Sequence, residues 1–148
     1  MKFLIQRVKE ASVTVDSETI GQIGEGFLVF VGVSSGDTYE IADKLLKKML
    51  NLRIFKDDAG KVNLNLSAVQ GELLIVSQFT LYADCRHGNR PSFTNAGSPD
   101  LANDLYEYII SKCKETVPNV QHGEFGADMK VTIINDGPFT VLLDSDEI

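Results

Sequence analysis

Hydrophobic and polar positions alternate in the first quarter of the chain, as they do in β-strands. Ala11, Val13 and Val15 are separated by polar residues, which is the period of a half-buried strand. Residues 3–8 also have an extended pattern. The apolar run at 27–31 follows several glycines and is typical of a strand covered on both faces. We therefore predict that 27–31 is a central strand of a sheet.

Two later segments have the period of amphipathic helices. Residues 37–40 resemble a capping box and apolar residues follow at helical spacing, so the first helix is predicted at about 38–50. Ser98 and Pro99 suit the N-cap and first turn of a second helix at about 99–115. The apolar stripe of this second helix is predicted to consist of Leu101, Leu105, Tyr108, Ile109 and Cys113.

The remaining apolar segments indicate further strands. We predict strands at 52–55 and 72–79, the first of them closed by a turn at 57–60. Near the end of the chain, period-two segments at 129–133 and 139–143 flank an Asn-Asp-Gly-Pro sequence, which predicts a closing hairpin. No internal repeat or linker divides the sequence. The whole chain is therefore predicted to form one domain that contains both α and β structure.

Composition narrows the possible classes of protein. The chain has 148 residues, of which 43% are hydrophobic and 24% are charged, which is ordinary for a globular domain. Its net charge of -7 argues against general binding of polyanions, so any contact with nucleic acid must be local. No apolar run approaches the roughly 20 residues that span a bilayer. The N-terminus becomes charged too early for a signal peptide, so the cytoplasm is the expected compartment.

The sequence has few signs of common catalytic or metal sites. Cys85 and Cys113 lack the spacing of a zinc site or a disulfide framework, so neither is expected. The common signatures of serine hydrolases, P-loop proteins, metalloproteases and dinucleotide-binding proteins are missing. His87 and His122 are the only histidines. Ser77 and Thr80 are possible nucleophiles but have no recognisable base, and hydrogen-bonded strand-end hydroxyls are the simpler interpretation.

Two basic segments are candidates for contact with RNA. Residues 86–93 mix cationic, glycine and aromatic residues, a combination that suits phosphate contacts and base stacking, although an ordinary surface loop has the same composition. The second segment could bind a nucleic-acid backbone or form a solvated helix face. Its basic residues are Lys44, Lys47, Lys48, Arg53, Lys56 and Lys61.

Two motifs carry a resemblance to a known family. Ser77-Gln78-Phe79-Thr80 follows the predicted strand at 72–79, and Asn135-Asp136-Gly137-Pro138-Phe139-Thr140 lies near the end of the chain. With these motifs the chain closely resembles the bacterial D-aminoacyl-tRNA deacylases over nearly its whole length. Further matching segments are Gln6-Arg7-Val8, Ala11-Ser12-Val13, Leu52-Arg53-Ile54-Phe55, Gly60-Lys61-Val62-Asn63, Gly88-Asn89-Arg90-Pro91-Ser92-Phe93 and Gly123-Glu124-Phe125-Gly126-Ala127-Asp128-Met129.

The resemblance implies a homodimeric editing enzyme. Such an enzyme hydrolyses the ester that joins a D-amino acid, or glycine, to the terminal adenosine of tRNA, and spares L-aminoacyl-tRNA. In that family a cis Gly-Pro pair enters the active site of the other subunit, so Gly137 and Pro138 would form a gate that rejects L side chains. The implied partners are the acceptor end of aminoacyl-tRNA and a second copy of the chain. No metal, cofactor, membrane or DNA is implied.

The resemblance also assigns roles to individual residues. The residues it places at the catalytic centre are Gln78, Phe79 and Thr80. The residues it places against the substrate are Ser77, Phe125 and Met129. Arg7 would help to seat Gly137 and Pro138. The substrate's own 2′-hydroxyl assists the reaction, so Thr80 would position the substrate instead of acting as a nucleophile, and backbone amides would stabilise the oxyanion.

The fold implied is one α/β domain of α+β character, in which strongly curved, barrel-like sheet layers are flanked by two main helices. The chain departs from the family pattern at Phe139, where the family usually has Val, which puts the stringency of L-rejection in question. Two other functions compete with this one. A non-catalytic RNA-binding module would bind through residues 86–93, and a small-molecule esterase would use Thr80 or Ser77 covalently.

Overall fold

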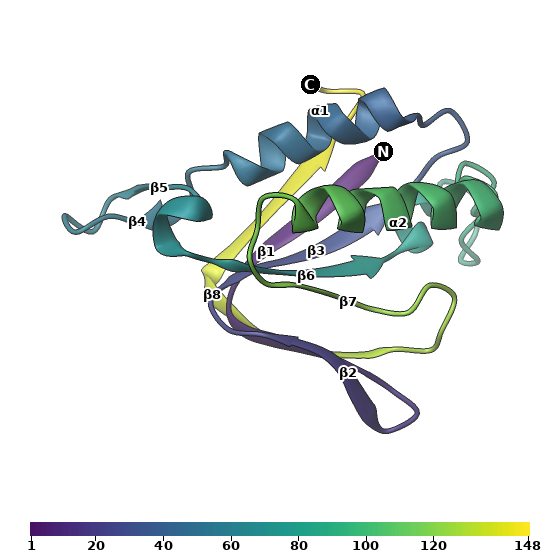
Figure 1. Ribbon diagram of the computed structural model, residues 1–148. Coiled ribbons are helices and arrows are strands. Elements are labelled where there is room, and N and C mark those ends of the chain that lie inside the picture. Colours follow the sequence, from purple (N-terminus) through teal and green to yellow (C-terminus); the bar gives the residue numbers. More distant parts are fainter.

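A six-stranded mixed sheet forms the centre of the molecule, and two helices lie over one of its faces (Figure 1). The structure is a computed structural model that describes all residues, 1–148. The path of the sheet is β2-β1-β3-β6-β7, and β8 pairs with the other side of β1. The strands are β1 (Lys2–Val15), β2 (Glu18–Ile23), β3 (Gly26–Gly32), β6 (Glu72–Ser77), β7 (Val120–His122) and β8 (Lys130–Asp144).

β1 is long enough to pair with three neighbouring strands. β3 pairs with its first half, β2 pairs with its second half, and β8 runs antiparallel along almost its whole length. The sheet curls, so that β2 also approaches β6 and β7. The predicted fold of a strongly curved sheet flanked by two helices is confirmed. The predicted central strand is also confirmed, because β3 lies between β1 and β6 and is buried along most of its length.

The helices begin and end close to their predicted boundaries. In α1 (Tyr39–Leu50) the Thr38 side chain accepts a hydrogen bond from the Ile41 amide, and in α2 (Pro99–Lys114) Ser98 caps the helix in the same way. Of the predicted stripe of α2, Leu105, Ile109 and Cys113 are buried, and Leu101 and Tyr108 are partly buried against the core. Tyr106, which the prediction did not include, is also buried. Neither helix is long and apolar enough to cross a membrane.

The predicted closing hairpin is wrong. Residues on both sides of the Asn-Asp-Gly-Pro sequence belong to one strand, β8, since Val131 pairs with Val13 and Val141 pairs with Ile5. Both halves therefore run in the same direction along β1, and two shifts in register near Val8 absorb the extra residues. The turn residues bend the strand without reversing it.

Two other predicted strands have different boundaries. The strand predicted at 52–55 is replaced by a short hairpin of β4 (Phe55–Lys56) and β5 (Val62–Leu64) around the predicted turn. The strand predicted at 72–79 ends at Ser77, and a 3₁₀ turn, η2 (Phe79–Tyr82), follows it. A second 3₁₀ turn, η1 (Ser67–Val69), precedes β6.

The hydrophobic core has two parts. The larger part lies between the helices and the sheet and includes Phe27, whose ring stacks on Phe55 at 5.1 Å between centroids. The smaller part lies inside the curl of the sheet, where Leu28 and Leu74 are fully buried. Between them the two parts bury both faces of β3 and β6, as the apolar runs of these strands require.

Both cysteines are free thiols, and we expect them to differ in reactivity. Burial raises the pKa of the Cys113 thiol to about 12, whereas Cys85 is exposed. At pH 8 the native protein should therefore react with one equivalent of a thiol reagent. The protein unfolded in urea should react with two equivalents. The Cys85→Ser variant should react with none until it is unfolded. Rapid labelling of native Cys85→Ser protein would contradict the burial of Cys113.

Candidate active site

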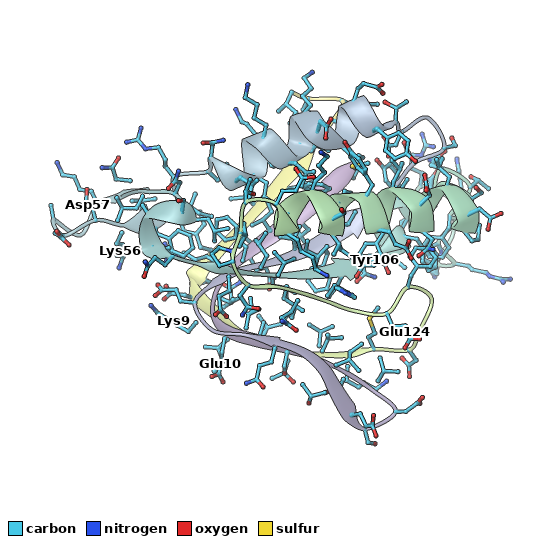
Figure 2. All side chains as sticks on the ribbon, viewed as in Figure 1. Lys9, Glu10, Lys56, Asp57, Tyr106 and Glu124 are labelled. Carbon is cyan, nitrogen blue, oxygen red and sulfur yellow. The ribbon has the colours of Figure 1, made fainter.

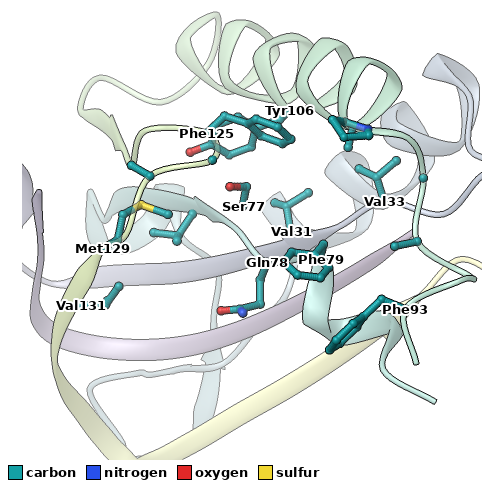
Figure 3. A pocket seen from close by; sticks show the side chains of 17 residues that line it. Val31, Val33, Ser77, Gln78, Phe79, Phe93, Tyr106, Phe125, Met129 and Val131 are labelled. Atoms are coloured by element: carbon teal, nitrogen blue, oxygen red, sulfur yellow. The ribbon is translucent and has the colours of Figure 1, made fainter. Parts of the chain in front are cut away.

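A mainly apolar cavity of about 610 Å³ opens where β6 ends, beside the start of α2 (Figure 3). Its walls come from β3, β6, the segment before α2, and the segment between β7 and β8. The lining residues are Val31, Val33, Val76, Ser77, Gln78, Phe79, Phe93, Ala96, Gly97, Pro99, Ala102, Tyr106, Phe125, Gly126, Ala127, Met129 and Val131.

One wall of the cavity is formed by the end of β6. Ser77 of β6 pairs with Val31 of β3, and the backbone amide of Gln78 donates a 2.8 Å hydrogen bond to the Val31 carbonyl. The chain then turns into η2, which leaves the Phe79 ring 56% exposed and in edge contact with Phe93 at 4.9 Å. Phe93 is partly buried, so one ring of this aromatic pair is open to solvent and is suited to stacking against a ligand base.

The opposite wall is held in place by Tyr106. Its hydroxyl lies 2.8 Å from the carbonyl oxygen of Ile75 in β6 and 3.2 Å from that of Gly123, just after β7. The ring of Tyr106 lies 6.0 Å from that of Phe125. Gly123 cannot be replaced without movement, because an added Cβ would lie 2.5 Å from the sulfur of Met129. These contacts hold the segment that carries Phe125 and Met129, and Figure 3 shows both side chains near Ser77, with Phe79 and Phe93 farther away.

The cavity contains no acid, base or thiol of ordinary pKa. Its lining includes no Asp, Glu, His, Lys, Arg or Cys residue, and neither His87 nor His122 reaches it. Burial raises the pKa of Tyr106, so this hydroxyl stays protonated. The polar groups that face the cavity are therefore the Ser77 hydroxyl, the Gln78 amide and the backbone. Such a set can bind and orient an ester, but it offers no histidine for a catalytic triad.

Thr80 lies beside the cavity instead of in its wall. The Gln78 side-chain amide donates a short hydrogen bond to the Thr80 hydroxyl. This contact fixes the orientation of the Gln78 side chain. Thr80 is thus placed to act on the cavity through Gln78.

Arg7, Gly137 and Pro138 form a second cluster away from the cavity. The Gly137-Pro138 bond is cis, and both residues are exposed. Arg7 is only 4% exposed and donates to the Asp136 carbonyl at 3.0 Å, while its guanidinium lies 4.8 Å from the Phe139 ring. Only glycine fits at 137, since its φ is +136° and a Cβ would lie 3.0 Å from the Arg7 side chain.

The structure thus divides the residues that the sequence singled out into two groups. Those gathered around the cavity are Ser77, Gln78, Phe79, Phe125 and Met129, with Thr80 adjacent. Arg7 lies beside Gly137, and neither these two residues nor Pro138 lines the cavity. Sequence reasoning missed Tyr106, for which the chain offers no local signal, and it placed Phe93 in a segment that either contacts RNA or forms an ordinary surface loop.

A family model described as D-Tyr-tRNA(Tyr) deacylase matches residues 4–144. The chain belongs to this family. The resemblance seen in the sequence is therefore confirmed, and the chain is an enzyme of the hydrolase class.

Individual relatives are similar over almost the whole chain. A D-aminoacyl-tRNA deacylase of Clostridium novyi (strain NT) is 57% identical over 145 residues, which cover 98% of this chain and 97% of that protein. One of Haemophilus influenzae (strain 86-028NP) is 59% identical over 140 residues, 95% of this chain and 96% of that protein. A solved structure of the c-Myc DNA Unwinding Element Binding Protein superposes with a TM-score of 0.92 at 40% identity, covering 97% of this chain and 98% of that one.

We expect the Tyr106 hydroxyl to stabilise the fold around the cavity. Tyr106→Phe removes the donor to two buried carbonyls and should lower the free energy of unfolding by about 1–2 kcal/mol. Tyr108→Phe is the control on the same helix, because its hydroxyl bonds to an exposed carboxylate, and it should change stability by less than about 0.5 kcal/mol. Urea unfolding measures both values, and equal losses would contradict the role of Tyr106.

Proposed function

We propose that the chain hydrolyses the ester of D-aminoacyl-tRNA, and of glycyl-tRNA, and leaves L-aminoacyl-tRNA intact. Residues 1–148 would act as one catalytic domain, in the cytoplasm, where aminoacyl-tRNA is made and used. Family membership supports the reaction. The observation that carries the mechanism is a cavity that can hold an aminoacyl ester but contains no histidine, carboxylate or thiol.

The cavity residues divide the work of binding and catalysis. Phe79 and Phe93 offer an aromatic platform for the terminal adenine. Phe125 and Met129 pack against the aminoacyl group, beside the Ser77 hydroxyl. The backbone amides of Phe79 and Thr80 stabilise the negative charge that develops on the ester carbonyl, because the Gln78 backbone amide already donates to Val31. Thr80 holds the side chain of Gln78 and does not attack the substrate.

The proton acceptor is supplied by the substrate. In this mechanism a water oxygen attacks the ester carbonyl carbon while the neighbouring 2′-hydroxyl of the terminal adenosine relays its proton. The bond from the carbonyl carbon to the 3′-oxygen then breaks, and the 3′-oxygen takes up the proton. Amino acid and tRNA are released. A cavity that lacks an ionisable base is compatible with this route and not with a serine-histidine mechanism.

The Gly137-Pro138 pair is the proposed gate. It has no side chain that could react, it is exposed, and Arg7 and the Asn135 side chain hold the chain on either side of it. A rigid, side-chain-poor loop excludes by shape. Since the pair does not line the cavity of its own chain, the gate must act on a second subunit, where an L side chain would collide with it and a D side chain or a glycine would not.

An exposed apolar surface supports the homodimer that this gate requires. Leu4 of β1 pairs with Leu142 of β8 on one side and Phe30 of β3 on the other. Successive side chains in a strand point to opposite faces of the sheet. Because the neighbouring residues Ile5 and Leu143 are buried on the face that the helices cover, these three side chains point away from the helices. Leu142 is 50% exposed. We propose that two copies of the chain meet through this face of the sheet.

The first test compares D- and L-tyrosyl-tRNA as substrates. The purified protein should hydrolyse the D ester at least about a hundredfold faster than the L ester, after subtraction of spontaneous loss, which corresponds to nearly 3 kcal/mol. Pro138→Ala should reduce this ratio about tenfold or more, because the gate loses its rigid surface. Pro118→Ala, which changes an exposed proline after α2, is the matched control and should keep the ratio.

The outcomes of this test separate the competing functions. Loss of neither ester above background would exclude the deacylase and favour the RNA-binding module, which binds without turnover. Equal hydrolysis of both esters by the unchanged protein would exclude the gate but not the deacylase activity. Phe139→Val restores the residue usual in the family, and an unchanged ratio would show that Phe139 does not weaken L-rejection.

A second test examines the proton acceptor. D-Tyrosyl-tRNA that ends in 2′-deoxyadenosine should be hydrolysed about a hundredfold or more slowly than the normal substrate, because the assisting hydroxyl is missing. Mass spectrometry of the quenched reaction should find no acyl adduct. An adduct on Thr80 or Ser77 would instead establish the esterase mechanism, for which Thr80→Ala and Ser77→Ala identify the nucleophile.

A further inference from the structure

Positive charge is concentrated at one end of this acidic protein. Residues 44–61 hold six of the fourteen Lys and Arg residues and only two acidic ones, although the whole chain has a net charge of -7. All six are exposed: three lie on α1, Arg53 lies between α1 and β4, and the other two lie on the hairpin of β4 and β5. We call this the basic surface, and it consists of Lys44, Lys47, Lys48, Arg53, Lys56 and Lys61.

Most charges of the basic surface have no charged partner within the chain; the exception is Lys44, which donates a 2.8 Å hydrogen bond to the main-chain oxygen of Ile148, the last residue. No basic side chain in it lies within 4.0 Å of a carboxylate side chain, whereas six of the other eight basic residues do. Asp57, in the turn of the hairpin, is occupied by the amides of Ala59 and Lys61 and by the side chain of Asn63. Lysines that the fold leaves unpaired are available for an external anion.

The basic surface lies beside the proposed gate and away from the cavity of its own chain. The Arg7 guanidinium donates to the Ile54 carbonyl at 2.5 Å and to the Asp136 carbonyl at 3.0 Å, so one side chain ties the hairpin to the gate. Figure 2 shows Lys56 and Lys9 toward one end of the molecule, and Tyr106 and Glu124 toward the other. The basic surface and the cavity of one chain therefore lie toward different ends of the molecule.

We propose that the basic surface binds the phosphate backbone of the tRNA whose ester lies in the cavity of the partner subunit. The inference rests on the proposed function. If the gate of one subunit enters the partner's cavity, the basic surface beside that gate lies near the mouth of the same cavity. The acceptor strand leaves this mouth with one negative charge per nucleotide, and unpaired lysines are suited to bind it. Each tRNA would therefore be held by both subunits.

A pair of charge reversals tests the binding step. Lys47→Glu with Lys48→Glu should raise KM for D-tyrosyl-tRNA about tenfold at about 0.1 M salt and leave kcat within about twofold. The slope of log(kcat/KM) against log[salt] should also become less negative by one to two. Lys112→Glu with Lys114→Glu is the matched control, since it makes the same change in net charge in the last turn of the other helix. It should leave KM within about twofold.

The KM values of the two double variants decide whether the basic surface binds tRNA. An unchanged KM in the Lys47 and Lys48 variant, or an equal rise in the control, would overturn the basic surface as a tRNA site. If that variant does not fold, as judged by its melting temperature, Lys56→Glu against Lys114→Glu makes the same test with single changes. Failure of the unchanged protein to hydrolyse D-tyrosyl-tRNA would overturn the proposed function instead.

Mixed dimers test which subunit supplies the basic surface. One subunit carries Gln78→Ala, which inactivates its cavity, so that only the other cavity reports. Placing the Lys47 and Lys48 reversals on this inactive subunit should raise KM about tenfold, whereas placing them on the active subunit should not. The opposite result would assign the surface to its own cavity and overturn the proposal. A chain that is monomeric by light scattering and still selective would overturn both this proposal and the cross-subunit gate.

Discussion

The arrangement of the segment proposed as the gate depends on the buried guanidinium of Arg7. A cation that is 4% exposed must be met by dipoles or anions, because an unpaired buried charge costs several kcal/mol. Arg7 is met by the carbonyls of Ile54 and Asp136, by the Asp136 carboxylate at 3.4 Å and by the ring of Phe139. These partners come from β8 and from the segment before β4. One cation on β1 thus fixes two segments that lie about 80 residues apart in the sequence.

The length of β1 explains why the end of the chain was harder to predict than the helices. Each helix carries its own start signal, Thr38 or Ser98, and these signals act over three or four residues. Asn135 to Pro138 also carries a local signal, for a reverse turn, but both flanking segments find partners along β1. Pairing between residues more than a hundred positions apart overrides the local preference, and no local pattern reports it. The sequence therefore predicted the residues of the bend and not its direction.

The cavity shows a second limit of prediction from chemistry. Ser77 and Thr80 were noticed because hydroxyl groups follow an apolar strand, yet a hydroxyl without a base carries little information about function. The resemblance identified the region, and the fold then added Tyr106 and Phe93 to it. Tyr106 was missed because a helix stripe can be drawn through position 105 with either Tyr106 or Tyr108 beside it. Only the carbonyls of Ile75 and Gly123, which come from other elements, select Tyr106 for burial.

A neutral cavity in an acidic protein separates two tasks, binding of the polyanionic tRNA and discrimination between amino-acid side chains. The cavity cannot attract a polyanion, because it has no charged lining residue and the chain as a whole repels phosphate. It can still discriminate by shape, since discrimination between mirror-image side chains depends on where a rigid surface stands and not on charge. Affinity must then come from charges outside the cavity, where salt and distance limit them to a few phosphates. Because these charges are tied through Arg7 to the gate, binding of the tRNA backbone and closure of the gate would depend on the same docked subunit. If the proposed dimer loosened, selectivity and affinity would be lost together, so a subunit that no longer rejected L esters would also bind tRNA weakly.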